Sequence, residues 1–316
     1  MPGDVQTARL LITCPDARGI IAAVAGFIAE HHGNILEADQ HSDPTQGPLQ
    51  GGCWAPGAWT GRTPLNVPSA AASPQGTFFM RVEIELDGFD LTRDTFATAW
   101  EAVARRFGMR WNVYWGNEVK RMAILVSKES HCVSDLLWRW RNGELRVDVP
   151  WVVGNHVDLL DAVRSYGVTF HHLPVSPETR TQQEARLVEL LESSDVDFIV
   201  LARYMQVLSS SLVSRFAQRI INIHHSFLPA FAGPRPYHQA FDRGVKIIGA
   251  TSHYVTDQLD EGPIIAQATL AIDHRDTVED LVRKGRDLER VVLADAVRLH
   301  VEDKILVSHN KTVVFD

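Results

Sequence analysis

Two polar side chains stand at alternate positions in an otherwise apolar segment, residues 220–229. Asn222 and His224 are separated by one residue, and the segment begins as a strand and ends in turn residues. Because residues two apart in a strand point to the same face, we expect these side chains to lie together. An amide donor beside an imidazole can stabilise the oxyanion that forms when a carbonyl is attacked. The pair therefore indicates chemistry at a carbonyl group.

Carboxylates follow further along the chain. Asp260 and Glu261 precede a Gly-Pro turn, which leads into a second apolar segment. A carboxylate near His224 can keep the imidazole protonated or accept a proton from water. Each residue also has a plainer interpretation, because strand Asn and His are often structural and loop carboxylates are often surface charges. On their own, these residues predict an α/β enzyme that acts on a carbonyl.

The histidines of this region do not follow the spacing of a metal site. They are His224, His225, His238 and His253. Adjacent histidines on a strand point to opposite faces. The segment also holds no HxH or HxxxH pair with a carboxylate as the third ligand. We therefore predict no metal site.

The composition limits the class of protein. The 316 residues suffice for two domains that each bury a core, and 45% apolar with 22% charged residues is typical of globular proteins. A formal net charge of −8 disfavours nucleic-acid and anionic-membrane partners, which call for clustered positive charge. Three separated cysteines (Cys14, Cys53 and Cys132) predict no disulfide framework. Because we find neither a membrane-length apolar run nor a signal-peptide pattern, we expect a cytoplasmic protein.

The first 116 residues have the order of a ferredoxin-like unit, βαββαβ. The expected strands are 10–13, 35–41, 78–86 and 110–115, and the expected helices are 20–31 and 89–107. Between the second and third strands, residues 43–77 hold six Pro and six Gly, which exclude a helix or a central strand. This stretch is either a long surface loop or a segment pinned to a neighbouring surface by Trp54 and Trp59.

After residue 120, apolar strands alternate with helices. Runs such as 198–201 are apolar without alternation, as parallel strands covered on both faces are. We therefore expect residues 117–316 to form a doubly wound, mostly parallel sheet with a site at the carboxyl ends of its strands. The last helix, residues 278–300, is expected to place charged residues on one face and apolar residues on the other.

Four segments resemble the formyltransferase fold that uses 10-formyltetrahydrofolate. They are residues 201–208 (LARYMQVL), 222–229 (NIHHSFLP), 249–255 (GATSHYV) and 259–265 (LDEGPII). Within that superfamily the chain is similar to formyltetrahydrofolate deformylases. The distinguishing segments are 127–132 (SKESHC), 138–141 (WRWR) and 233–241 (GPRPYHQAF), together with the second histidine, His225. The first 116 residues resemble an ACT domain, a small-molecule-sensing module.

The resemblance implies a set of site residues. Asn222, His224 and Asp260 match the catalytic triad of the family. The residues that match its folate pocket are Met205, Gln206, Val207, Leu208, His253, Val255, Thr256 and Asp257. In the ACT unit, Gly19 and Asn34 match positions that often bind an amino-acid effector, for which the family suggests glycine or methionine.

The resemblance also implies the activity. The substrate would be 10-formyltetrahydrofolate, hydrolysed to formate and tetrahydrofolate without a bound cofactor, with the formate serving one-carbon and purine metabolism. A homo-oligomer is expected by resemblance only. Two alternatives remain: a formyltransferase to an amine, and a catalytically silent amino-acid-binding regulator. Residues 127–131 hold no glycine-rich phosphate cradle, which favours water over a phosphorylated amine as acceptor.

Overall fold

The computed structural model describes residues 6–44, 57–58, 66–67, 76–116, 118–230 and 235–316. Most of the Pro/Gly-rich stretch, including Trp54 and Trp59, lies outside the described residues. The chain divides into two compact units, the first made of Met1–Glu118 with Asp303–Asp316 and the second of Val119–Glu302. The expected division after residue 116 assigned the last residues to the second domain, whereas the structure groups Asp303–Asp316 with the first unit.

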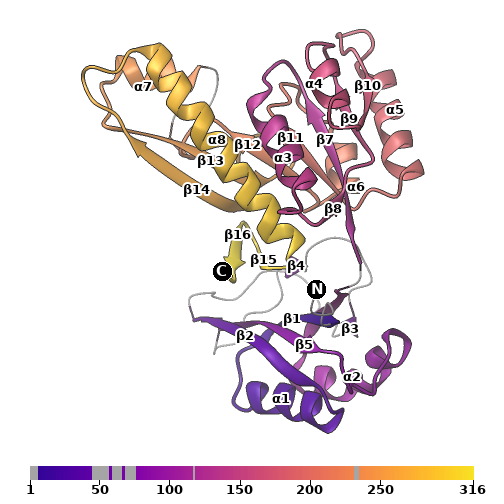
Figure 1. The fold of residues 1–316 in the computed structure, drawn as a ribbon. Helices are drawn as coiled ribbons and strands as arrows, with labels where there is room; N and C mark the ends of the chain where they lie inside the picture. The colour runs from indigo at the N-terminus through magenta and orange to yellow at the C-terminus, as the bar shows by residue number, and fades with distance from the viewer. Residues whose placement is uncertain (1–5, 45–56, 59–65, 68–75, 117, 231–234) are drawn as a thin grey trace. The chain divides into compact units, whose positions relative to one another are not determined.

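The first unit contains a mostly antiparallel sheet with the order β2-β5-β1-β6-β3, which confirms the ferredoxin-like fold (Figure 1). Its main elements are β1 (Thr7–Pro15), α1 (Ile20–Glu30), β2 (Asn34–Asp43), β5 (Thr77–Glu85), α2 (Arg93–Phe107) and β6 (Arg110–Trp115). The short β3 (Gly57–Ala58) lies at an edge of the sheet, where it pairs with β6. Helix α2 begins later than expected because the hydroxyl groups of Thr92 and Thr95 cap its first turn.

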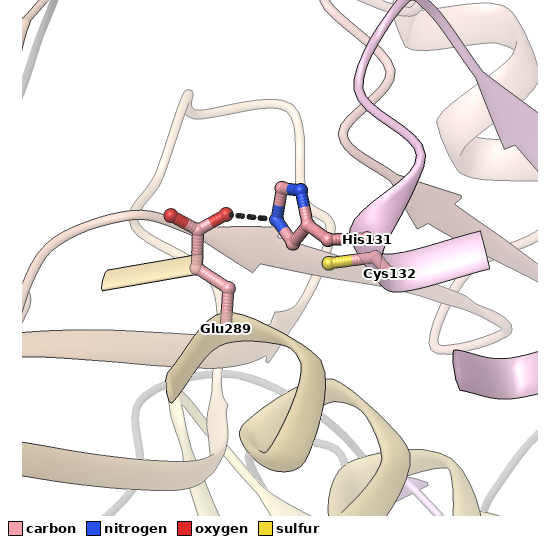
Figure 2. A group of neighbouring side chains, drawn as sticks. All are labelled: His131, Cys132 and Glu289. Carbon is pink, nitrogen blue, oxygen red and sulfur yellow. Dashed lines mark hydrogen bonds and ion pairs between the residues drawn. The ribbon is translucent and has the colours of Figure 1, made fainter. Parts of the chain in front are cut away.

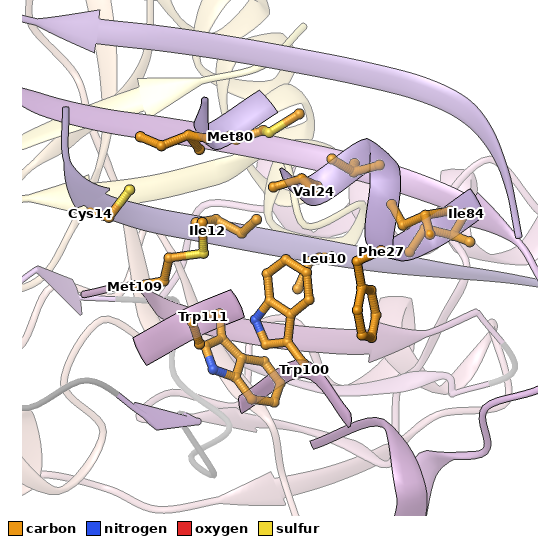
Figure 3. Packing of buried hydrophobic residues seen from close by; sticks show 14 of the residues in the cluster. Leu10, Ile12, Cys14, Val24, Phe27, Met80, Ile84, Trp100, Met109 and Trp111 are labelled. Atoms are coloured by element: carbon orange, nitrogen blue, oxygen red, sulfur yellow. The ribbon is translucent and has the colours of Figure 1, made fainter. Parts of the chain in front are cut away.

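One face of this sheet carries the core of the first unit. Alternate residues of β5, such as Met80 and Ile84, pack with the apolar stripes of the two helices. Figure 3 shows Trp100 of α2 among these residues, beside Phe27 of α1. The rings of Phe27 and Trp100 meet edge to face at 4.9 Å, an arrangement that suits their opposed quadrupoles.

The other face of the same sheet explains why the end of the chain belongs to the first unit. Leu11 and Phe79 point away from the helices and are buried against Leu306 and Phe315. These partners come from the carboxyl-terminal segment, whose strands are β15 (Ile305–Ser308) and β16 (Lys311–Val314). The short β4 (Asn66–Val67) pairs in parallel with β15.

The second unit contains the expected, mostly parallel sheet, with the order β10-β9-β7-β11-β12-β13-β14. The first five strands in this order are parallel, while β13 and β14 form an antiparallel hairpin beside β12. The strands are β7 (Lys120–Val126), β8 (Val147–Asp148), β9 (Trp151–Gly154), β10 (Thr169–His172), β11 (Phe198–Ala202), β12 (Ile220–His224), β13 (Ile247–Tyr254) and β14 (Ile264–Ala271). The helices are α3 (His131–Arg141), α4 (Leu160–Arg164), α5 (Arg180–Ser193), α6 (Ser210–Arg215), α7 (Pro236–Asp242) and α8 (Val278–Val301).

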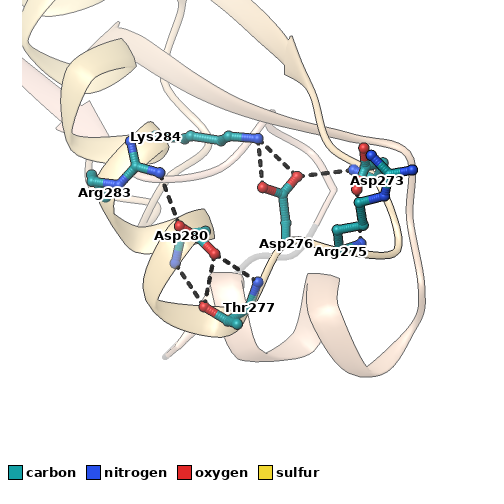
Figure 4. Close-up of polar contacts among 7 residues, drawn as sticks. All are labelled: Asp273, Arg275, Asp276, Thr277, Asp280, Arg283 and Lys284. Atoms are coloured by element: carbon teal, nitrogen blue, oxygen red, sulfur yellow. Dashed lines mark hydrogen bonds and ion pairs between the residues drawn. The ribbon is translucent and has the colours of Figure 1, made fainter.

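Helix α8 is anchored at its first turn by polar contacts (Figure 4). The Thr277 hydroxyl accepts from the Asp280 amide, and the Asp280 carboxylate accepts from the Thr277 amide. Both oxygens of Asp276 accept hydrogen bonds from Lys284, eight residues further on. These caps satisfy amide groups that the first turn of a helix otherwise leaves unpaired. In the part of the chain that the structure describes, no helix is long and apolar enough to cross a membrane.

Candidate active site

A cavity of about 660 Å³ opens in the second unit at the carboxyl ends of β11 and β12. Its walls come from the segment that follows β11, the end of β12, the segment between β13 and β14, and helices α7 and α8. Parallel strands present their carboxyl ends at one edge of the sheet, which is where ligands bind in open α/β folds. The cavity therefore lies where the strand pattern predicts a site.

The three residues expected to be catalytic line this cavity together. His224 Nδ1 lies 3.3 Å from Asp260 Oδ1, and His253 Nε2 lies 3.8 Å from the same oxygen. Asn222 Nδ2 is 3.2 Å from His253 Nε2. Because His253 Nδ1 faces the Tyr254 carbonyl oxygen at 3.0 Å and must donate to it, Nε2 of this ring accepts from Asn222. The Asp260 carboxylate and the Asn222 amide thus orient the rings of His224 and His253.

Strand pairing and one glycine position this group. Asn222 of β12 lies opposite His253 of β13, which brings their side chains together. Asp260 adopts a left-handed backbone conformation with φ of 58°. Two residues later, a Cβ on Gly262 would lie 1.7 Å from the Tyr254 carbonyl oxygen, so only glycine permits the close approach of this segment to β13. The turn thereby holds the carboxylate against His224.

The electrostatics favour an ionised Asp260. The hydrogen bond from His224 lowers the pKa of the Asp260 carboxyl below its usual value, and this effect outweighs the opposing effect of burial. Burial lowers the pKa of His253, so this ring stays neutral and accepts from Asn222. His224 is only 6% exposed, and within the described ranges its buried Nε2 has no hydrogen-bond partner. That nitrogen can serve a bound substrate.

The eight residues expected to bind folate all line the cavity. The side chains of Met205 and Val207 are 60% and 56% exposed, which is unusual for large apolar groups and gives the mouth of the cavity an apolar surface. A hydrogen bond holds the backbone of the same segment in place, because the Met205 amide donates to the Ser127 hydroxyl at 2.9 Å. The structure thus brings the predicted triad and the predicted binding segments to one place.

The two residues expected to bind an effector do not meet within one copy of the chain. Gly19 precedes α1 with φ of 91°, whereas Asn34 follows that helix and donates a hydrogen bond to Glu85. The helix between them has 11 residues, so its ends are roughly 16 Å apart. The strand register agrees, because Asn34 pairs with Glu85 at one end of β5 and the strand before Gly19 finishes at the other.

A second group of polar side chains lies at the wall of the same cavity. Glu289 of α8 is 1% exposed and accepts hydrogen bonds from His131 Nε2 at 2.8 Å and from the Tyr237 hydroxyl at 2.6 Å. Arg203 Nε lies 3.4 Å from the same carboxylate. We call His131, Arg203, Tyr237 and Glu289 the Glu289 cluster. Burial alone would raise the pKa of Glu289, but His131 and Arg203 outweigh it and lower that pKa.

A metal ion at this group must be considered, because His131, Cys132 and Glu289 place possible ligand atoms within 4.8 Å of one another (Figure 2). The surroundings disfavour a cation. The positive Arg203 lies beside the carboxylate, and His131 Nε2 already bonds to it. Burial and the charge of Glu289 raise the pKa of the Cys132 thiol well above its usual value, which opposes the thiolate that a metal would need.

The role of Glu289 was not predicted from the sequence, where the charged residues of the last helix were expected on one face and the apolar residues on the other. Glu289 stands three residues before the buried Val292 and eight after the buried Leu281, positions that share one helical face. An acid at an apolar helical position was therefore the available signal. Gly285 on the same face completes the arrangement, because a Cβ there would lie 2.0 Å from the Tyr237 hydroxyl oxygen.

This fold and site define a class: a formyltransferase-type domain joined to an ACT domain. The family model for formyl transferases matches residues 120–297, and the ACT domain model matches residues 8–51. The formyltetrahydrofolate deformylase of Synechocystis sp. is 47% identical over 98% of each chain. A solved formyltetrahydrofolate deformylase from Pseudomonas syringae has a TM-score of 0.88 at 43% identity, covering 100% of this chain and 96% of that one. The chain belongs to the formyltetrahydrofolate deformylase family.

A transferase of the same fold is similar over a shorter range. The glycinamide ribonucleotide transformylase 1 of Symbiobacterium toebii has a TM-score of 0.60 at 34% identity. The match covers 64% of this chain and 97% of that one. The deformylase matches cover 98% and 100% of this chain and so extend over both of its domains.

Proposed function

We propose that the protein hydrolyses 10-formyltetrahydrofolate to formate and tetrahydrofolate. The names of its full-length relatives support this activity. The observation that carries it is His224, whose Nδ1 bonds to Asp260 while its buried Nε2 has no partner among the residues that the structure describes. A buried polar atom without a partner costs free energy, so it is expected where a ligand completes the hydrogen bond.

The geometry suits attack by water on the formyl carbon. His224, protonated beside the ionised Asp260, donates through Nε2 to the developing oxyanion. The Asn222 amide, which lines the same cavity, is the second donor. Asp260 orients the water and His224 and passes a proton toward the leaving nitrogen. The new carbon–oxygen bond yields formate, and the broken carbon–nitrogen bond releases tetrahydrofolate.

The proposal also covers the cofactor, the effector, the assembly and the location of the protein. No metal or bound cofactor is needed, because the formyl group arrives activated on the folate. We propose an amino-acid effector such as glycine or methionine for the first unit, supported by the ACT match. Because Gly19 and Asn34 lie at opposite ends of α1, a site that uses both requires two copies of the chain, which agrees with a homo-oligomer. We place the enzyme in the cytoplasm, where tetrahydrofolate would be recycled.

The test is a formate-release assay on the full chain with 10-formyltetrahydrofolate, with and without candidate amine acceptors. The proposal expects formate and tetrahydrofolate in equal amounts without any added amine. Transfer of the formyl group only when an amine is present would contradict hydrolysis and support a transferase. Binding of glycine or methionine without any turnover would instead indicate a silent regulator.

A further inference from the structure

Among the imidazoles of the cavity that the mechanism above does not use, His225 is the one next to His224 in the chain, and it is half-buried, whereas His238 is exposed. His225 lines the wall next to His224, with ring centroids 5.1 Å apart, and it lies 6.0 Å from the ring of Tyr237. Within the described part of the chain, these ring contacts are its close interactions, and its nitrogens bond to no other residue. A half-buried imidazole with unused nitrogens beside the reacting groups is available to a small ligand.

Both histidine rings face the cavity because the strand ends between them. Adjacent histidines were expected on opposite faces, which holds only inside a regular strand. Strand β12 finishes at His224, and the chain bends at His225. The side chain of His225 consequently points toward α7 and α8 without leaving the cavity wall.

The groups that surround His225 keep its ring unprotonated. Burial and then the positive charge of Arg203 lower its pKa to about 3, and the nearby His224 acts in the same direction. Glu289 on α8 and Asp260 act in the opposite direction and are outweighed. Tyr237 on α7 keeps its proton, because burial and Glu289 raise its pKa. An unprotonated imidazole offers one donor and one acceptor nitrogen.

We propose that His225 binds the attacking water, and that the Glu289 cluster holds its ring in place for this task. The inference rests on the proposed hydrolase function and names the group that selects water as the acceptor. The acceptor nitrogen of the ring accepts a hydrogen bond from one O–H group of the water. The lone pairs of the water oxygen are then directed toward the formyl carbon. A protonated ring could only donate, and it would engage the lone pair needed for attack.

The Glu289 cluster supports this geometry through Tyr237. Its carboxylate fixes the Tyr237 hydroxyl at 2.6 Å, and the Tyr237 ring contacts His225. Gly285 allows that approach, since any larger residue would collide with the Tyr237 hydroxyl. Arg203, held at the carboxylate of Glu289, has the left-handed φ of 63°, a conformation that is strained for a non-glycine residue. The structure thus maintains a strained residue beside the proposed water site.

The step balances without a further reactant. The water oxygen bonds to the formyl carbon while the bond from that carbon to the folate nitrogen breaks. One proton of the water passes through Asp260 to the leaving nitrogen, and the other is released when formic acid ionises.

The test compares two acceptors on the full chain, water and hydroxylamine. Hydroxylamine attacks the same carbon with its own nitrogen, forming formohydroxamate while the folate nitrogen takes a proton. In His225→Ala, formate release should fall by about 10²-fold while formohydroxamate formation is retained. Asn222→Ala should lose both products, because it acts on the formyl oxygen. His225→Gln should recover part of the hydrolysis, since its amide oxygen accepts a hydrogen bond.

Two results would overturn the inference: unchanged formate release in His225→Ala, or an equal loss of both products. These outcomes differ from a failure of the proposed function, which would appear as absence of formate release from the unmodified chain. Thermal unfolding of each variant accompanies the assay, and the formohydroxamate yield shows that the cavity of the folded variant still binds folate.

Discussion

The second unit contains two imidazole–carboxylate pairs that differ in what surrounds the carboxylate. Asp260 lies at the cavity with a side chain 16% exposed, and its close partner is His224 at 3.3 Å. Glu289 is 1% exposed and is held by His131, Tyr237 and Arg203. A carboxylate with two hydrogen-bond donors and a neighbouring guanidinium is fixed as a buried anion, whereas one with a single close donor keeps an oxygen for a reacting proton. We therefore expect the Glu289 carboxylate to act as a structural scaffold and the Asp260 carboxylate to act as a reagent.

The largest effect is expected from a change in the Asp260–His224 pair. Asp260→Asn should reduce formate release by about 10³-fold, because the amide cannot accept the proton of the water. Its unfolding midpoint should stay close to that of the unmodified protein, since the side chain keeps its shape. Glu261→Gln is the matched control, because this neighbouring carboxylate does not line the cavity, and it should retain turnover. Near-normal formate release from Asp260→Asn would contradict the assigned role.

Removing the charge of the scaffold carboxylate should instead affect folding. Glu289→Gln leaves Arg203 beside an uncharged partner in a buried site, and we expect a loss of about 3–5 kcal/mol in the free energy of unfolding, measured with urea. The control is Asp287→Asn on the same helix, which breaks an exposed contact with Arg290 and should cost less than about 1 kcal/mol. Equal effects in the two variants would show that the Glu289 cluster is not a structural anchor.

The pH profile links the two regions through His225. Arg203→Met removes a positive charge that lowers the pKa of His225, so that pKa rises, although burial still holds it below the usual value of about 6.5. Because hydrolysis requires the unprotonated ring, activity should be lost from the acid side, at a higher pH than in the unmodified enzyme. Arg203→Lys keeps the charge and should keep the acid limb in its original place. Identical profiles for the two variants would refute the link.

The smallest change tests the close contact under Tyr237. Gly285→Ala places a Cβ 2.0 Å from the Tyr237 hydroxyl oxygen, so the ring must leave Glu289, and stability should fall by about 1–3 kcal/mol. Gly26→Ala in α1 is the matched helical control. Beyond its own helical turn, no atom of the described residues lies within 4 Å of its added Cβ, and it should stabilise the protein by about 0.5–1 kcal/mol. A neutral Gly285→Ala variant would mean that the approach of α7 to α8 does not depend on glycine.

Much of the fold was predictable because it follows from local patterns. The alternation in residues 78–86 and the helical spacing from Ile20 to Ile28 predict the ferredoxin-like unit, and the structure confirms it. The carboxyl-terminal pairing was not predictable in this way. Strands of four residues carry little periodic signal, and their burial depends on Leu11 and Phe79, which are remote in sequence.

The candidate site divides in a similar manner. Asn222 and His224 could be paired from their spacing alone, and the resemblance supplied Asp260 and the binding segments. The Glu289 cluster could not be assembled, because its members come from α3, α7, α8 and the end of β11 and meet only through tertiary packing. The position of His225 depends on where β12 ends, which is a boundary that sequence patterns locate poorly.

The most direct test of the central claim is a single-turnover reaction of the full chain with 10-formyltetrahydrofolate in water labelled with oxygen-18. Attack by water on the formyl carbon predicts one labelled oxygen in each formate released, with tetrahydrofolate formed in equal amount. Unlabelled formate, or tetrahydrofolate that appears only when an amine acceptor is added, would contradict hydrolysis at this site.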